Sequence, residues 1–435
     1  MVVALSILAL TVTLSIGRPR LRHISINPAA AAAIGALLTL LFVIPVPLGW
    51  LAIRTLSRPV VTVVSLMIVT LVAERAGLFR VLAWRIARAA RGDGRRLFAY
   101  LFLAASLTGM LFTNDAAILI FTPLVCDLVD RVGGSWRRAN RLPYYFAVLF
   151  VANSVGVLVI SNPINIIVAS LFDIGFMEYA RWMVLPGLVS ILTSYAGLAW
   201  IFRHQIPKAY AEPPSDRSHG SVGPCAAVCA SILMAALIGF FSEQATGVPV
   251  WAVAAAAAVL LLAIQAVVEP PGVPIILKRV GWDVVLFVIG MFIVAYGLRH
   301  VGLAGQIAEL LRAAAGASVP GLTLCTALAA AGFSAIMNNH PTATIMAMVI
   351  EDFGAPWSET RMLVFAALIG GDLGPRMLPI GSLAALLWFA ILRSRGVSIP
   401  YGLYVRTGVP ITIAAILLSI LTLNLEFWYT GAGPD

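Results

Sequence analysis

Two polar clusters interrupt long apolar stretches of this chain, and the second repeats the first with changes. Thr113-Asn114-Asp115-Ala116 is followed 224 positions later by Met337-Asn338-Asn339-His340. Amide and carboxylate groups are costly in hydrocarbon, so such groups inside apolar stretches indicate a functional site. The sequence therefore indicates functional groups at two equivalent positions, around residues 113–116 and 337–340.

The same offset relates other landmarks of the chain. Met67 in VVSLMIV corresponds to Met291 in LFVIGMF, and the apolar run from Val2 corresponds to the run from Ala226. Duplicated halves with interrupted hydrophobic segments at matching positions are typical of secondary transporters and mark their binding sites.

Two further interruptions carry polar groups, at Ser161-Asn162-Pro163 and between Gly370 and Ser382. A hairpin tip or a helix break leaves backbone N–H and C=O groups unpaired in the membrane, where they must bind protein, water or substrate. Prolines explain why the helices cannot continue; they are Pro163, Pro341, Pro375 and Pro379. The residues expected to bind substrate are Asn114, Ser161, Asn162, Asn165, Asn338, Asn339, Gly381 and Ser382.

The expected cavity combines these neutral donors and acceptors with two carboxylates, Asp115 and Asp372, and one cation, Arg376. Such groups suit a small, neutral, hydroxylated solute or a partly hydrated cation, whereas a dianion needs more positive charge. The two acids lie on opposite halves and are the expected proton carriers. Thr113, Thr342, Arg376 and His340 are expected accessory residues, and no metal site is expected.

These residues also have purely structural interpretations. The asparagines at the tips and breaks can cap half-helices. Asp115 can pair with a backbone donor or with Arg376, while Arg376 can neutralise Asp372 or a helix C-terminus. His340 can serve in packing or as a proton relay. The sequence leaves these alternatives open.

Composition assigns the chain to the membrane class. Hydrophobic residues make up 61% of the 435 residues, charged residues 11%, and the mean hydropathy is +0.98. The net charge of +10 comes from arginines that alternate with apolar spans, a pattern of membrane topology rather than of nucleic-acid binding. Four cysteines suggest no disulfide framework. Cys225 and Cys229 lie one helical turn apart, a spacing that suits a soft ion, although packing is the commoner role.

The sequence predicts an all-α polytopic membrane protein with two inverted repeats, about ten transmembrane helices, two re-entrant hairpins and two broken helices. Uninterrupted spans are expected near residues 2–16, 29–48, 58–74, 181–202, 224–241, 249–268, 282–298 and 408–427.

Arginines on both flanks of the interrupted segment 98–130 place both flanks on the cytoplasmic side, which favours a hairpin over a crossing. The first repeat is then residues 1–202, with hairpin 98–130 and broken helix 143–173. A polar cytoplasmic linker follows at 203–223. The second repeat is 224–427, with hairpin 321–352 and broken helix 361–392, and residues 428–435 form a C-terminal tail.

These segments resemble the bacterial arsenite efflux permeases of the ion transporter superfamily. The resemblance covers most of the chain and is densest in TNDAAILIFTPLV (113–125), ISNPINIIVAS (160–170), MNNHPTATIMAM (337–348), GGDLGPRMLPIGSLAALLW (370–388) and WDVVLFVIGMFIVAYGLR (282–299). The chain departs from the family pattern at three positions. His340 occupies a position where a Met-like apolar residue is expected, Arg376 replaces a lysine, and Gly371 replaces an asparagine.

The resemblance implies export of arsenite and antimonite as neutral hydroxides in exchange for protons, by a multi-pass protein of the bacterial inner membrane. It implies no enzyme activity, no cofactor and no nucleic-acid partner. Some relatives work with a soluble arsenical ATPase, a partner that the resemblance allows. The chain has no GxxxxGK[ST] loop of its own, so it is not a primary pump alone.

Three other functions are weighed against this one. A sodium/proton antiporter shares the architecture and the two acids, but sodium needs more charged oxygen ligands at one point. A dicarboxylate carrier of the same superfamily is expected to carry Ser-Asn-Thr at both breaks, which read Ser161-Asn162-Pro163 and Ile380-Gly381-Ser382. An intramembrane aspartyl protease using Asp115 and Asp372 lacks its Gly-x-Gly-Asp signature and ranks last.

Overall fold

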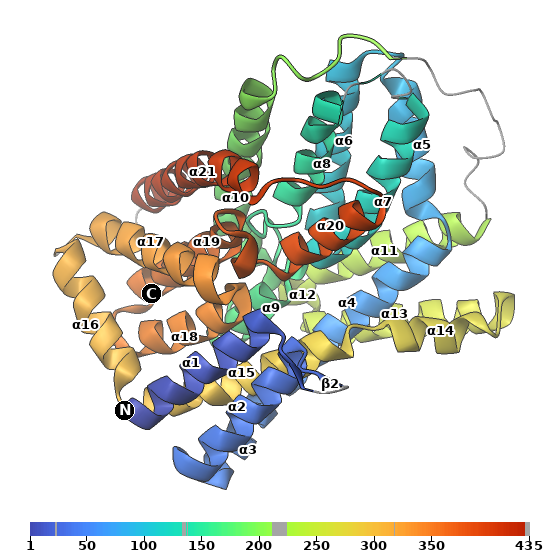
Figure 1. Cartoon of the computed structure of the whole chain (residues 1–435). Coiled ribbons are helices and arrows are strands. Elements are labelled where there is room, and N and C mark those ends of the chain that lie inside the picture. The colour runs from blue at the N-terminus through green and yellow to red at the C-terminus, as the bar shows by residue number, and fades with distance from the viewer. Residues whose placement is uncertain (22–23, 133–135, 137, 211–223, 317, 431–435) are drawn as a thin grey trace.

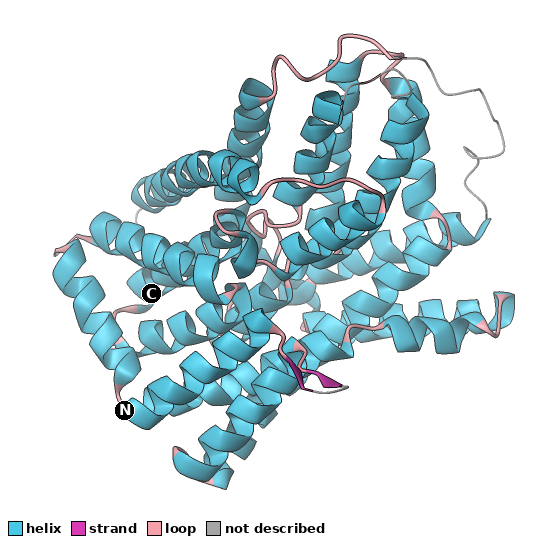
Figure 2. Cartoon of the chain, in the orientation of Figure 1, coloured by secondary structure: helices cyan, strands magenta, loops and turns pink. Residues whose placement is uncertain are grey.

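Helices build nearly all of the protein in the computed structural model (Figures 1 and 2). The structure describes residues 1–21, 24–132, 136, 138–210, 224–316 and 318–430. Most of the predicted linker (211–223) and of the predicted C-terminal tail (431–435) lies outside these residues.

The elements up to residue 202 are α1 (Val2–Gly17), β1 (Arg20–Leu21), β2 (Ile24–Ser25), α2 (Pro28–Phe42), α3 (Val46–Thr55), α4 (Ser57–Arg75), α5 (Leu78–Ala89), α6 (Gly94–Leu111), α7 (Asn114–Val132), α8 (Arg138–Val151), η1 (Val159–Ser161), α9 (Pro163–Leu171) and α10 (Phe176–Ile201). The two short strands pair antiparallel and are a small departure from the expected all-α fold.

The elements after the linker are α11 (Pro224–Phe241), α12 (Glu243–Thr246), α13 (Val250–Val268), α14 (Gly272–Arg279), α15 (Trp282–His300), α16 (Leu303–Ala315), α17 (Val319–Met337), α18 (Asn339–Asp352), α19 (Trp357–Leu373), η3 (Gly374–Arg376), η4 (Pro379–Gly381), α20 (Leu383–Ser394) and α21 (Tyr401–Thr430).

Several helices are long and apolar enough to cross a membrane. Among the described residues there are six, at Ser57–Arg75, Phe176–Ile201, Val250–Val268, Gly272–His300, Val319–Met337 and Tyr401–Thr430. Four shorter apolar helices accompany them, at Val2–Gly17, Pro28–Phe42, Cys225–Phe241 and Ala384–Ser394. The protein is therefore a helical membrane protein with several apolar spans, while the count of about ten crossings stays a prediction.

One predicted span is divided into two helices. The sequence predicts a single helix over 29–48, but α2 ends at Phe42 and α3 begins at Val46. Pro45 separates them, because its ring lacks an N–H and its backbone is extended (φ −68°, ψ 148°). At the other end, the Asn27 side chain accepts a hydrogen bond from the Ala30 N–H, and Pro28 takes the first helical position.

The loops that matter for chemistry lie in the interior of the helical assembly. Figure 2 shows loop segments near its centre, between the α8–α9 and the α19–α20 regions. There α17 packs on α19, α18 packs on α9, and α20 packs on α7. Helices from both halves of the chain therefore meet around one region.

Candidate substrate-binding site

Two helical hairpins place their tips in this region. The first joins α6 to α7 at Asn114, and the second joins α17 to α18 at Asn338. Asn338 has a positive φ of 82°, which is uncommon for a residue other than glycine. Its side chain accepts a hydrogen bond from the His340 N–H at 3.2 Å and so caps α18.

The first broken helix opens earlier than the sequence predicts. Helix α8 ends at Val151, about ten residues before the predicted break at Ser161-Asn162-Pro163. Non-helical backbone then leads to η1, and α9 begins at Pro163 with Asn162 as its cap. This longer break adds Asn153 and Gly156 to the groups available at the site.

The second broken helix opens after its acidic residue. Helix α19 continues to Leu373, so Asp372 still lies on regular helix. The chain then passes through η3 and η4, and Ser382 caps α20 by accepting a hydrogen bond from the Ala385 N–H at 2.9 Å.

Asp372 joins the two breaks. Its Oδ2 accepts hydrogen bonds from the Gly156 N–H at 2.9 Å and the Asn165 Nδ2 at 3.0 Å, and its Oδ1 accepts one from the Asn162 Nδ2 at 2.7 Å. Asp372 is 2% exposed. All three donors are neutral, so the carboxylate is held by dipoles from the other half of the chain and not by an ion pair.

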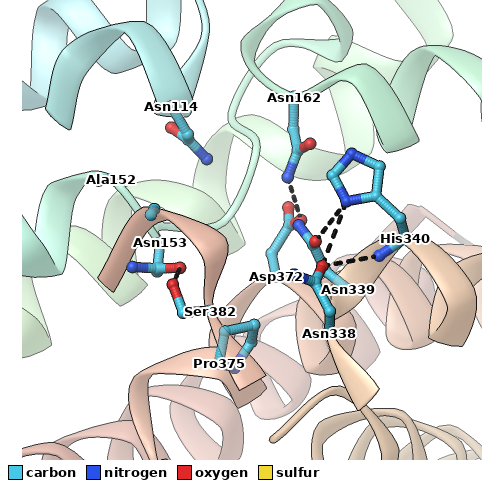
Figure 3. Close-up of a pocket in the computed structure, with 11 residues that line it drawn as sticks. Asn114, Ala152, Asn153, Asn162, Asn338, Asn339, His340, Asp372, Pro375 and Ser382 are labelled. Carbon is cyan, nitrogen blue, oxygen red and sulfur yellow. Dashed lines mark hydrogen bonds between the residues drawn. The ribbon is translucent and has the colours of Figure 1, made fainter. Parts of the chain in front are cut away.

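A small cavity lies between the tips and the breaks (Figure 3). Its lining residues are Asn114, Ala152, Asn153, Asn162, Asn338, Asn339, His340, Asp372, Pro375, Ser382 and Ala384. The cavity volume is about 10 Å³, close to the space that a single water molecule needs. The site is therefore closed around polar side chains in this conformation.

Seven of the predicted site residues line this cavity: Asn114, Asn162, Asn338, Asn339, His340, Asp372 and Ser382. Four other predicted residues do not line the cavity but make hydrogen bonds or packing contacts near it. The Ser161 hydroxyl donates to the Leu158 carbonyl at 2.6 Å, and the Thr342 hydroxyl donates to the Asn338 carbonyl at 2.8 Å. Asn165 holds Asp372, as described above. Gly381 packs so closely on α17 that a Cβ there would lie 2.2 Å from the Ala335 carbonyl oxygen.

Two more predicted residues are not placed in the lining. Thr113 is buried next to the first tip, and it is not without an interaction partner. The side chain of Asp115 lies outside the part of the chain that the structure describes, so its predicted role stays a prediction.

Arg376 is buried beside the cavity and binds groups outside its lining. Its guanidinium donates to the Ser194 hydroxyl at 2.8 Å and to the Phe150 carbonyl at 2.6 Å, and it lies over the Phe150 ring. Phe150 is in the last turn of α8, so the cation meets a helix C-terminus, one of the two roles that the sequence left open. Among the described residues, no ion pair joins Arg376 to Asp372.

Sequence reasoning missed Asn153. Its Oδ1 accepts a hydrogen bond from the Ser382 hydroxyl at 2.8 Å, and its Nδ2 donates to the Leu149 carbonyl at 3.2 Å. An asparagine in the apolar stretch VLFVANSVGVLV was an available signal, because it is as costly in hydrocarbon as Asn162.

The cysteines stand apart from this site. Cys225 and Cys229 line a separate small pocket between α4, α11 and α13, and none of the four cysteines lines the central cavity. In the described part of the chain, no three His, Cys, Asp or Glu side chains gather as a metal site.

Solved transporter structures share this fold. The Alcanivorax borkumensis YdaH transporter matches with a TM-score of 0.59 at 15% identity, over 99% of this chain and 98% of that one. Neisseria gonorrhoeae MtrF, described as illuminating a class of antimetabolite efflux pumps, matches with a TM-score of 0.55 at 12% identity, over 98% and 94%. At these identities the likeness concerns the fold alone.

Sequence relatives identify the family. The arsenical pump membrane protein of Escherichia coli strain K12 is 31% identical over 99% of this chain and 100% of its own length. A putative arsenical pump membrane protein of Bacillus subtilis is 24% identical over 93% and 95%. The family model described as ArsB, arsenical pump membrane protein, matches residues 3–429. The chain therefore belongs to the ArsB family of arsenical pump membrane proteins.

Proposed function

We propose that this protein exports arsenite and antimonite as neutral trihydroxides in exchange for protons. The family is one of membrane transporters and not of enzymes. The observation that carries the proposal is the central cavity, in which amide and hydroxyl groups surround one described carboxylate, Asp372.

The lining suits this cargo chemically. A trihydroxide has hydroxyl groups that both donate and accept hydrogen bonds, and asparagine amides and the Ser382 hydroxyl offer both complements. Arg376 directs its guanidinium at Phe150 and Ser194 and is not among the lining residues, so the described part of the lining presents no Lys or Arg to an anionic cargo. A neutral polar solute therefore fits better than a dicarboxylate.

Proton exchange fits the position of Asp372. Its charged form is held by Gly156, Asn162 and Asn165, and it lines the same cavity as the proposed solute contacts. Protonation would weaken these hydrogen bonds and free their donors, so proton binding and the shape of the cavity are coupled. Asp115 at the first tip is the second proposed proton carrier.

The inverted repeats are also proposed, and helix packing supports them. The 224-residue offset pairs α2 with α13 and α4 with α15; α2 packs on α15, and α4 packs on α13. The offset likewise pairs α7 with α18 and α9 with α20; α18 packs on α9, and α20 packs on α7. Contacts that recur with the partners exchanged are the mark of a two-fold relation.

The closed cavity requires movement during transport. A trihydroxide is larger than the single water molecule that the cavity matches, so the half-helices have to separate to admit it. Alternating access between repeats provides such a movement. With the arginine-rich loops inside, the protein would work in a bacterial inner membrane, releasing its cargo outward.

A sodium/proton antiporter is the alternative function, and the bonding of Asp372 disfavours it. Sodium prefers several oxygen ligands, yet both Asp372 oxygens already accept hydrogen bonds from N–H groups. Binding sodium there would displace three donors that then need other partners.

Uptake into everted membrane vesicles tests the proposal. Vesicles with the protein should accumulate arsenite and antimonite when their interior is acidified, and should not drive sodium. Vesicles without the protein are the control. Proton-driven sodium uptake without arsenite uptake would establish the antiporter instead.

A further inference from the structure

His340 brings an unused acceptor to the cavity. It is 4% exposed, lines the cavity, and its Nε2 has no hydrogen-bond partner. Among the buried side-chain atoms of the described lining residues, Asn114 Oδ1 also lacks a partner, but it packs against Gly109 of α6. A buried polar atom without a partner is destabilising, so such an atom at a binding site suggests a contact that the cargo supplies.

The surroundings of the ring determine which nitrogen carries the proton. Nδ1 lies 2.8 Å from Asn339 Oδ1 and 3.2 Å from Asn338 Oδ1. The orientation of Asn338 is fixed, because the same oxygen accepts the His340 backbone N–H. Because the Asn338 oxygen can only accept, Nδ1 carries the hydrogen, which leaves a lone pair on Nε2 of the neutral ring.

Packing holds the ring in this orientation. Phe287 of α15 makes an edge contact with the imidazole, with ring centroids 5.8 Å apart. Figure 3 shows the ring beside Asn338 and Asn339 at the second tip, with Asn162 and Asp372 close by and Asn114 on the other side of the cavity. The unused acceptor thus comes from the tip of the second hairpin, at the start of α18.

We propose that His340 Nε2 accepts a hydrogen bond from one hydroxyl group of the transported solute and so favours solutes that carry several hydroxyl groups. This role rests on the proposed function of the cavity. A solute with two or more hydroxyl groups can donate to Nε2 while another of its hydroxyl groups binds the asparagine amides of the lining, whereas a solute with one hydroxyl group leaves one of these contacts unmade.

The chemistry of the ring separates this role from cation binding. Hard cations such as sodium prefer oxygen ligands over an imidazole nitrogen. A soft metal ion needs several nitrogen or sulfur ligands, and the described residues gather no such set around His340. A hydroxyl donor remains as the partner that suits a single neutral imidazole nitrogen.

Three substitutions test the role. His340→Leu removes both ring nitrogens, His340→Asn keeps a polar group only at the Nδ1 position, and His340→Gln restores a polar group near the Nε2 position. Transport into everted vesicles is measured for arsenite, for methylarsonous acid with two hydroxyl groups and for dimethylarsinous acid with one.

The preference for two hydroxyl groups over one is the decisive readout. We expect the parental protein and His340→Gln to keep this preference, and His340→Leu and His340→Asn to reduce it by about 2- to 12-fold, the value of one hydrogen bond. The change should appear in the half-saturating concentration and leave the turnover at saturation similar.

The outcomes separate this inference from the proposed function. If the parental protein transports arsenite but His340→Leu keeps the full preference, the inference is wrong and the proposed function stands. Equal losses for all three solutes, at equal amounts of folded protein by size-exclusion chromatography, would show a structural role and also overturn the inference. No transport of any arsenical by the parental protein would overturn the proposed function itself.

Discussion

Asp372 is the residue on which the central geometry depends. It draws donors from Gly156, Asn162 and Asn165, which lie more than 200 positions away in the sequence. Without this carboxylate the first break would have no partner for these N–H groups, and they would be buried and unpaired. One side chain thus serves both to join the broken helices and to place a carboxylate in the lining of the cavity.

Replacing Asp372 with asparagine should abolish proton-driven export while the protein remains inserted. The amide cannot take up a proton. Its NH₂ group also replaces an oxygen that accepts a hydrogen bond in the parental protein, so one N–H donor loses its acceptor, which costs about 1–3 kcal/mol of stability. Arsenite uptake into everted vesicles should no longer respond to an imposed pH gradient. The sequence predicts the same for Asp115→Asn.

Asp352→Asn is the matched control for this prediction, since Asp352 pairs with Arg299 at a partly exposed position away from the cavity. That variant should keep the parental response. If Asp372→Asn and Asp115→Asn both take up arsenite at the parental rate across the pH range, then the proton travels by another route.

Two serines at the breaks should differ in their effect on transport. The Ser382 hydroxyl lines the cavity and donates to Asn153, whereas the Ser161 hydroxyl bonds only within its own turn. Ser382→Ala should raise the half-saturating arsenite concentration about 2- to 12-fold, and Ser161→Ala should leave it near the parental value. Equal effects of the two variants would contradict the boundary that the structure gives to the cavity.

At the level of elements, close packing of α17 on α19 positions Asp372. Gly370 and Gly374 face small residues of α17, where an added Cβ would lie 2.0 Å from the Ala327 carbonyl oxygen and 2.4 Å from the Ala331 carbonyl oxygen. Small residues allow helices to approach in membranes, where lipid tails offer no hydrophobic drive for association. The Ser334 hydroxyl adds a hydrogen bond to the Gly371 carbonyl at 2.6 Å.

Gly370→Ala and Gly371→Ala should therefore have opposite effects on stability. The first substitution places a methyl group against the backbone of α17 at Ala327 and should destabilise the protein by about 1–3 kcal/mol. The second meets nothing within 4 Å and should be neutral or stabilising by about 0.5–1 kcal/mol, as alanine is a better helix former than glycine. Thermal unfolding in detergent, followed by loss of the monodisperse peak, measures both. A tolerated Gly370→Ala would contradict the packing.

Local sequence signals predicted the tips and breaks because prolines and asparagines are conspicuous in apolar stretches. Asn114, Asn338, Pro163 and Ser382 all lie where helices end or begin. The early end of α8 at Val151 was missed, because its signal was weaker: Asn153 follows it, but no proline does. There the backbone is held by distant partners: the Gly156 carbonyl accepts from the Tyr179 hydroxyl, and its N–H donates to Asp372.

Across the whole molecule, the offset in the sequence reappears as exchanged helix contacts. The pairs α2–α15 and α4–α13, and the pairs α9–α18 and α7–α20, are the same contacts with the halves interchanged. Asp372 has no acidic counterpart under this relation, because the 224-residue offset places Val148 at the equivalent position of the first half. The helix contacts thus recur in both halves, while the described carboxylate of the cavity comes from the second half and its hydrogen-bond donors from the first.

The position of the cysteines gives a last prediction about the whole molecule. Cys225 and Cys229 line a pocket between α4, α11 and α13, Cys126 lies in α7 and Cys325 in α17, and the central cavity is lined without thiols. A carrier must release its cargo, and arsenic(III) held by two or three thiolates would leave slowly. A variant with all four cysteines replaced by serine or alanine should therefore export arsenite at a rate similar to that of the parent.

Everted vesicles with matched amounts of the parental and cysteine-free proteins test this expectation, and the antimonite rate serves as a second readout. The variant that restores Cys225 and Cys229 in the cysteine-free protein is the matched control, because these two thiols share one pocket. If the cysteine-free protein is well folded but inactive, and restoring this pair recovers export, then recognition of hydroxyl groups is wrong. The cargo would in that case pass through thiolate ligands, and the pocket between α4, α11 and α13 would belong to its route.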